Sequence, residues 1–93
     1  MRSFETWKRK MMKDPAFKKE YDALEEEYAL AGKLVDARVK AKLTQEQVAR
    51  RMGTSQSAVA RMESGRKMPS TTSLQKYAAA VGHRVRIKLL KVG

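Results

Sequence analysis

The sequence predicts a mainly α-helical fold that ends in a single β-strand, and three observations lead to this prediction. Apolar residues recur at helical spacing from residue 15 to residue 82, with cap residues and glycines between the helical stretches. After Gly82 the pattern changes to alternating basic and apolar residues, which is typical of a half-buried strand. The 93-residue chain has no cysteine, so its core must come from packing rather than from disulfides.

The first long helix is predicted to begin at Asp14-Pro15, an N-cap acid followed by proline at the first helical position. Its apolar stripe continues to residue 41, but Gly32 lies inside it. The pattern therefore leaves open whether residues 15–41 form one helix or two that meet near Tyr28. Residues 3–12 also have helical spacing, and either form a helix of their own or remain frayed.

Three shorter helices follow, and each has a predicted N-cap and a glycine after its last turn. They run from Thr44 to Gly53, from Ser55 to Gly65 and from Ser70 to Gly82. Thr44 and Gln47 have the spacing of a capping box. The residues expected to face the core are Val48, Ala49, Met52, Val59, Met62, Leu74, Tyr77, Ala78 and Val81.

The predicted strand over residues 84–92 alternates Arg84, Arg86 and Lys88 with apolar residues. Its apolar members, Val85, Ile87 and Leu89, are the candidate dimer contacts. A lone strand leaves its backbone unpaired, so we expect it to pair with a second copy of the chain or with a different protein. The alternative is that it packs on its own domain or is partly disordered. The chain thus divides into an N-terminal helical extension (1–27), a helical domain (28–82) and the strand (83–93).

Charge is distributed unevenly along the chain, whose net charge is +11. Residues 14–27 contain six acidic and two basic side chains, whereas residues 28–93 contain three acidic and fourteen basic side chains. A basic body attracts polyanions, of which nucleic acid is the first candidate and an anionic membrane or an acidic protein the second. No apolar run is long enough to cross a bilayer and no signal peptide is visible, so we expect a cytoplasmic protein without a membrane partner.

Residues 44–64 have the pattern of a helix-turn-helix, with a capped helix, a turn at Gly53 and a second capped helix. The second helix of this motif places its N-terminal end in the major groove of DNA. Gln56, Ser57 and Arg61 are the candidate base contacts, because glutamine can pair with adenine and arginine with guanine. Alternatively, Gln56 and Ser57 are ordinary solvated residues, and Arg61 either pairs with Glu63 or is solvated. Thr54 and Ser55 suit phosphates, although Ser55 is at least an N-cap.

The segment "LTQEQVARRMGTSQSAVARMESGRKMPSTTSLQKYAAAVG", residues 43–82, resembles the helix-turn-helix of the Xre/Cro/C1 repressor family. The resemblance implies a lambda-repressor-like bundle of four or five helices that binds double-stranded operator DNA as a homodimer. It also implies phosphate contacts from Gln45 and from Ser64, Gly65, Arg66 and Lys67 beyond the recognition helix.

The layout around this motif resembles HigA-type antitoxins of toxin–antitoxin modules, in which a helical extension containing "DPAFKKEYDALEEEYALA" precedes the domain. Membership would imply a small, basic RelE/HigB-like ribonuclease toxin as partner and repression of the shared operon. An acidic helix with aromatic anchors suits such a partner. The candidate toxin contacts are Phe17, Tyr21, Leu24, Glu25 and Tyr28. The alternatives are that these aromatics pack on the chain's own bundle, or that the protein is a stand-alone repressor without a toxin.

Enzymatic function is not expected. The single histidine, His83, has no partner in a recognisable catalytic motif, and the sequence has neither HExxH nor a glycine-rich phosphate loop. No cofactor or metal is expected. RNA binding suits the charge, but RNA bases are usually stacked on aromatic side chains, and the recognition helix has none.

Overall fold

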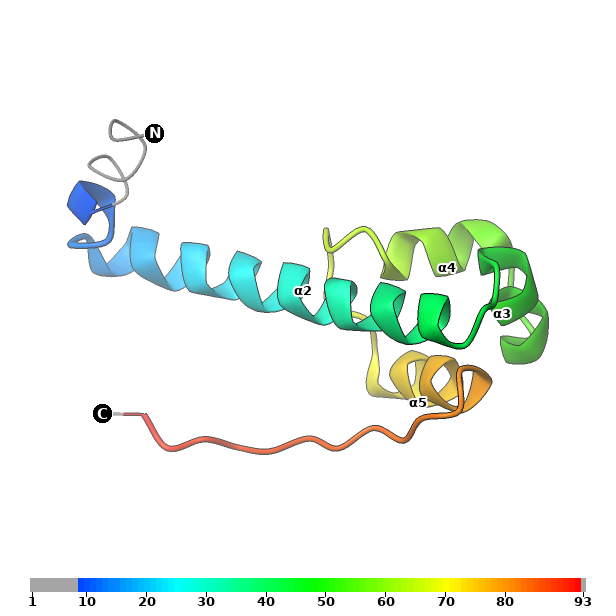
Figure 1. Cartoon of the computed structure of the whole chain (residues 1–93). Helices are drawn as coiled ribbons and strands as arrows, with labels where there is room; N and C mark the ends of the chain where they lie inside the picture. The colour runs from blue at the N-terminus through cyan, green and yellow to red at the C-terminus, as the bar shows by residue number, and fades with distance from the viewer. Residues whose placement is uncertain (1–8, 93) are drawn as a thin grey trace.

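The computed structural model describes residues 9–92, and for Phe17 and residues 21–25 it describes the backbone alone. The fold is built from α2 (Pro15–Lys40), α3 (Gln45–Met52), α4 (Gln56–Met62) and α5 (Thr71–Ala80). Figure 1 shows α3, α4 and α5 gathered around the downstream half of α2, while its upstream half extends away from them. The all-helical bundle expected from the sequence is therefore confirmed.

Helix α2 is a single helix that continues through Gly32, which decides between the two alternatives left open by the sequence. Asp14 caps it, because its Oδ1 accepts a hydrogen bond from the Ala16 N–H at 3.0 Å. Its 26 residues span about 39 Å at 1.5 Å per residue. Neither α2 nor any other helix within residues 9–92 is long and apolar enough to cross a membrane.

The predicted caps of the three short helices are present. Thr44 and Gln47 form the capping box at α3: the Gln47 N–H donates to Thr44 Oγ1 at 3.1 Å, and the Thr44 N–H donates to Gln47 Oε1 at 2.8 Å. Ser55 and Ser70 accept hydrogen bonds from backbone N–H groups in the first turns of α4 and α5. Gly53 follows α3 with a φ of 70°, in the left-handed region that favours glycine.

The core lies where α3, α4 and α5 pack against the downstream half of α2. Val48, Val59 and Tyr77 are its fully buried side chains, one from each short helix. The rest of the core cluster is Leu34, Ala49, Leu74, Ala80 and Val81, with Leu30, Ala37, Leu43, Met52, Met62 and Val85 packed against it. Every residue expected to face inward from the short helices is in this cluster, except for Ala78, which is also buried.

The predicted C-terminal strand is not formed, so this part of the fold prediction is wrong for the isolated chain. Residues 83–92 contain no strand and run as an extended tail (Figure 1). A strand requires a hydrogen-bonded neighbour, and residues 9–92 supply no second strand. Val85 packs against the core, whereas Ile87 is 63% exposed and Leu89 is 99% exposed.

Candidate nucleic-acid interface

Helix α4 is fixed against α3 by a tight turn and by the core. The Thr54 N–H donates to the Ala49 carbonyl oxygen at 2.9 Å, which closes the turn after Gly53. Val48 of α3 and Val59 of α4 are both fully buried in one cluster. The inner face of α4 is therefore committed to the core, and its orientation is set by packing rather than by surface residues.

The outer face of α4 presents the three predicted base contacts, since Gln56, Ser57 and Arg61 are all exposed. Arg61 lies four residues after Ser57, on the same side of the helix. Ser57 Oγ lies 3.1 Å from the Oγ of Ser55, which also accepts a hydrogen bond from the Ala58 N–H at 3.2 Å. Ser55 is thus the N-cap, and Gln56 and Arg61 are the two long polar side chains that project from α4.

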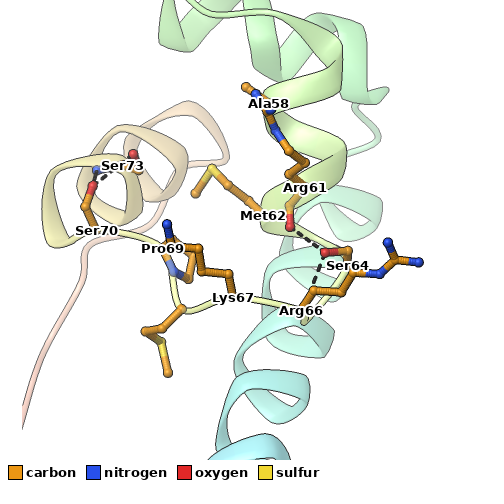
Figure 2. A pocket seen from close by; sticks show the side chains of 10 residues that line it. Ala58, Arg61, Met62, Ser64, Arg66, Lys67, Pro69, Ser70 and Ser73 are labelled. Carbon is orange, nitrogen blue, oxygen red and sulfur yellow. Dashed lines mark hydrogen bonds between the residues drawn. The ribbon is translucent and has the colours of Figure 1, made fainter.

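A groove of about 500 Å³ lies between the C-terminal end of α4, the loop that follows it and the start of α5 (Figure 2). Its lining includes the cationic side chains of Arg61, Arg66 and Lys67, and no carboxylate lines it. Ser64 Oγ donates to the Arg61 carbonyl oxygen at 2.7 Å and accepts from the Arg66 N–H at 3.3 Å. The loop is therefore fastened to the end of α4, and its charge suits a phosphate backbone.

Gln45, predicted to contact a phosphate, is half-buried, and its side chain is held by a polar network centred on Glu63. The Glu63 side chain is only 4% exposed. It accepts hydrogen bonds from Arg38 Nε at 2.8 Å, Arg38 Nη2 at 3.0 Å, Gln45 Nε2 at 3.1 Å and the Tyr77 hydroxyl at 2.8 Å. Arg38 also donates to the Leu43 carbonyl oxygen at 3.0 Å. The network joins all four helices at the end of α4.

The alternative that Arg61 pairs with Glu63 is wrong, because Glu63 forms its ion pair with Arg38. Sequence reasoning missed this network. Arg38 and Glu63 are 25 residues apart on different helices, and no local spacing connects them. The usable signal is that Glu63 is a lone acid in the basic stretch after Glu46.

Burial of Glu63 favours its neutral form, but hydrogen bonds from Arg38, Tyr77 and Gln45 together outweigh burial and lower the pKa of Glu63. The hydrogen bond to Glu63 raises the pKa of Arg38. Burial, followed by the Glu63 hydrogen bond and charge, raises the pKa of Tyr77. At neutral pH the network therefore contains an ionised carboxylate, a charged guanidinium and a neutral phenol that donates.

The other predicted phosphate contacts differ in exposure. Thr54, Arg66 and Lys67 are exposed, whereas Gly65 is buried with a φ of 73°. No group of three or more His, Cys, Asp or Glu side chains that could hold a metal ion lies among the described residues.

Of the predicted toxin contacts, Tyr28 is described, and its side chain is 57% exposed. The side chains of the others lie outside the described residues: Phe17, Tyr21, Leu24 and Glu25. Glu20 and Glu26 are exposed on the same upstream half of α2. Two exposed acids therefore lie on the upstream half of α2, which Figure 1 shows extending beyond the bundle, whereas Tyr28 lies near the middle of α2 and close to Gly65 of the loop after α4.

Comparison with known proteins identifies a helix-turn-helix in the residues that contain α3 and α4. Antitoxin HigA1 of Mycobacterium tuberculosis, from strains CDC 1551 / Oshkosh and ATCC 25618 / H37Rv, is 37% identical over 76 residues. These residues are 82% of this chain and 51% of the relative, so the chain spans about half the length of the curated relatives it matches. No solved structure matches the chain significantly. The family described as Helix-turn-helix matches residues 34–83, more than half of the chain. The chain therefore belongs to this helix-turn-helix family, in its Xre/Cro/C1-like form.

Proposed function

We propose that this chain is a sequence-specific DNA-binding repressor that reads the major groove with α4. The observation that carries the proposal is the pair of exposed side chains, Gln56 and Arg61, on a helix whose other face is locked into the core. Gln56 offers an amide that matches adenine, and Arg61 offers a guanidinium that matches guanine. Ser57 lies beside them as a shorter base contact.

Phosphate contacts on both sides of α4 hold it in register. The proposed phosphate contacts that precede α4 are Thr54 and Ser55. Those that follow it are Ser64, Gly65, Arg66 and Lys67. Gln45 contributes from α3: one N–H of its amide is taken by Glu63, and the second N–H remains for a phosphate oxygen. The cationic groove beside α4 supports this assignment, since phosphates attract Arg and Lys without regard to base sequence.

The repressor acts as a homodimer, and the tail supplies the contact. Pairing of residues 84–92 with the same segment of a second copy would satisfy their backbone groups and cover Ile87 and Leu89, whereas Val85 already packs against the core. The large exposed fractions of Ile87 and Leu89 support this proposal. A two-fold dimer presents its recognition helices about 34 Å apart, or at a multiple of one DNA turn.

The second part of the proposed function is neutralisation of a toxin, a small basic ribonuclease of the RelE/HigB class. Two observations support it: the similarity to proteins named Antitoxin HigA1, and the acids on the upstream half of α2, of which Glu20 and Glu26 are exposed. Phe17, Tyr21, Leu24, Glu25 and Tyr28 are the proposed contacts. An acidic surface steers a basic partner and blocks the surface with which it binds RNA.

DNA binding is tested with fluorescence anisotropy on duplex DNA taken from upstream of the protein's own gene and on a scrambled duplex of equal length. We expect the upstream duplex to bind more tightly at physiological salt, and Arg61→Ala to remove most of that difference. Lys76→Ala, an exposed cation on α5, is the matched control. Equal affinity for both duplexes would contradict sequence-specific recognition.

Toxin binding is tested by pull-down from the native cell with the full-length chain and a Glu20→Lys/Glu26→Lys variant. We expect wild type to capture a small basic protein and the variant to lose it. Asp36→Lys/Glu46→Lys, which reverses two exposed acids outside this surface, is the charge-matched control and should keep the partner. If no bait captures a partner while specific DNA binding remains, the chain is a stand-alone repressor. The closeness of Tyr28 to Gly65 supports the separate alternative that this one aromatic packs on the chain's own bundle.

A further inference from the structure

Tyr28 lies against the loop that carries the proposed phosphate contacts, although it precedes the matched helix-turn-helix residues 34–83. A Cβ atom built on Gly65 would come within 2.9 Å of Tyr28 Cε1 and within 3.2 Å of Tyr28 Cα. Real Cβ atoms essentially never come within 3.0 Å of another heavy atom, so a side chain at this position would require Tyr28 or the loop to shift. The loop backbone at Gly65 thus rests directly on Tyr28.

The same glycine is fixed by its own backbone. Gly65 has a φ of 73°, which side chains rarely adopt, and it is buried. On one side, Ser64 ties the loop to the end of α4 through its bonds to the Arg61 carbonyl and the Arg66 N–H. On the other side lie Arg66 and Lys67, both exposed. The position of Gly65 over α2 therefore sets where these two cations emerge.

The remaining surface of Tyr28 shows that its packing is not that of a core residue. Its side chain is 57% exposed, and it does not belong to the core cluster. In contrast, Tyr77 is fully buried and bonded to Leu34 and Glu63. Removing the Tyr28 ring should therefore release the loop while the core stays intact.

We propose that Tyr28 is a positioning residue of the DNA interface. Its ring holds the loop 64–67 in the position from which Arg66 and Lys67 contact the phosphate backbone. This inference rests on the proposed DNA binding. It extends the interface to a residue of α2 that precedes the matched residues 34–83. Tyr28 touches no DNA itself and acts only through Gly65.

The test uses the full-length chain and a mixed-sequence 30-base-pair duplex, because backbone contacts do not require the operator. Tyr28→Ala is compared with Tyr28→Phe, which keeps the ring, and with Val39→Ala, a truncation of a side chain on α2 with 59% exposure. Affinity is measured by anisotropy at several salt concentrations. NMR spectra report the chemical shift of the Gly65 amide, which responds to the ring current of a tyrosine this close.

We expect Tyr28→Ala to weaken duplex binding and to reduce the salt dependence by about one to two units, since each backbone contact contributes about 0.9. The Gly65 amide signal should shift, while the signals of the core residues stay in place. Tyr28→Phe and Val39→Ala should match wild type in both measurements.

Wild-type affinity and salt dependence in Tyr28→Ala would overturn the inference, provided that Lys67→Ala weakens binding of the same duplex. Loss of the folded spectrum in Tyr28→Ala would also overturn it, because the ring would then be needed for folding rather than for placing the loop. If wild type fails to bind the duplex, or if Lys67→Ala has no effect, the proposed DNA contacts are wrong and not merely this inference.

Discussion

Glu63→Gln keeps the size of a side chain that is only 4% exposed, but it removes the charge at the centre of the polar network. The carboxylate accepts four hydrogen bonds, two of them from Arg38 and one each from Gln45 and Tyr77. A glutamine has a single acceptor oxygen, and its amide NH₂ group would face the donors of Arg38. At least one bond to Arg38 is therefore lost, and the guanidinium charge is left without its partner.

The size of the effect follows from burial. Hydrogen bonds to charged groups contribute about 1.5–3 kcal/mol, and removing one partner of a buried ion pair costs about 3–5 kcal/mol. The Arg38 side chain is 17% exposed and keeps its bond to the Leu43 carbonyl oxygen, so part of this cost is recovered. We expect a loss of about 3 kcal/mol in the free energy of unfolding, which lowers Tm by roughly 12–24 °C.

Urea unfolding followed by circular dichroism measures this loss. The slope of the unfolding free energy against urea concentration should be the same for the variant and wild type. Glu46→Gln is the matched control, because Glu46 is exposed on α3, and it should stay within about 0.5 kcal/mol of wild type. A loss below about 1 kcal/mol for Glu63→Gln would refute the reasoning, since the pair would then behave as an ordinary surface ion pair.

The pH dependence of stability tests the same charge. The pKa of Glu63 is lowered in the folded protein from an ordinary value of 4.5. The ionised group therefore contributes stability that is complete above that ordinary value and is lost as pH falls through the lower folded pKa. We expect the stability difference between wild type and Glu63→Gln to narrow below pH 4.5. A constant difference across this range would contradict an ionised Glu63.

Three further changes test the surface and the ends of the helices. Lys67→Ala should weaken binding to every DNA sequence and reduce the slope of log affinity against log salt concentration by about one unit. A variant that only loses its preference between DNA sequences would contradict a phosphate contact. Lys42→Gly should raise the unfolding free energy by roughly 1 kcal/mol, because Lys42 has a φ of 58°, and a decrease would show that this turn carries no strain. Removing residues 86–93, which spares Val85, should convert a dimer into a folded monomer in sedimentation, whereas an unchanged dimer would contradict the proposed role of the tail.

The parts of the fold that sequence predicts well are those set by neighbours three or four residues apart. The Asp14, Thr44, Ser55 and Ser70 caps accept bonds from backbone groups two or three residues away, so the sequence specifies them locally. The inward faces of α3, α4 and α5 follow from the same short periods. Because the recognition helix is defined by these local signals, the exposed face of α4 was predictable as well.

The contacts that sequence did not predict join residues distant in the chain. Glu63 pairs with Arg38, and the one hydroxyl hydrogen of Tyr77 is shared between Glu63 and the carbonyl oxygen of Leu34, 43 residues away. Neither pair has a local spacing that marks it. The tail was instead assigned an element that it does not form. The alternation of basic and apolar residues over 84–92 predicted a strand, but this pattern describes only the side chains. A strand also needs a hydrogen-bonded neighbour, and residues 9–92 contain no second strand.

Sequence-specific recognition by α4 is the central claim, and selection from a pool of randomised duplexes tests it most directly, with wild type and Arg61→Ala compared side by side. The account predicts a wild-type consensus of two half-sites with centres about 34 Å apart, or a multiple of one DNA turn. Arg61→Ala should bind this consensus roughly 1–3 kcal/mol more weakly and lose its preference at one position in each half-site. A pool without a consensus, or an equal loss of affinity for all sequences in the variant, would contradict base reading by α4.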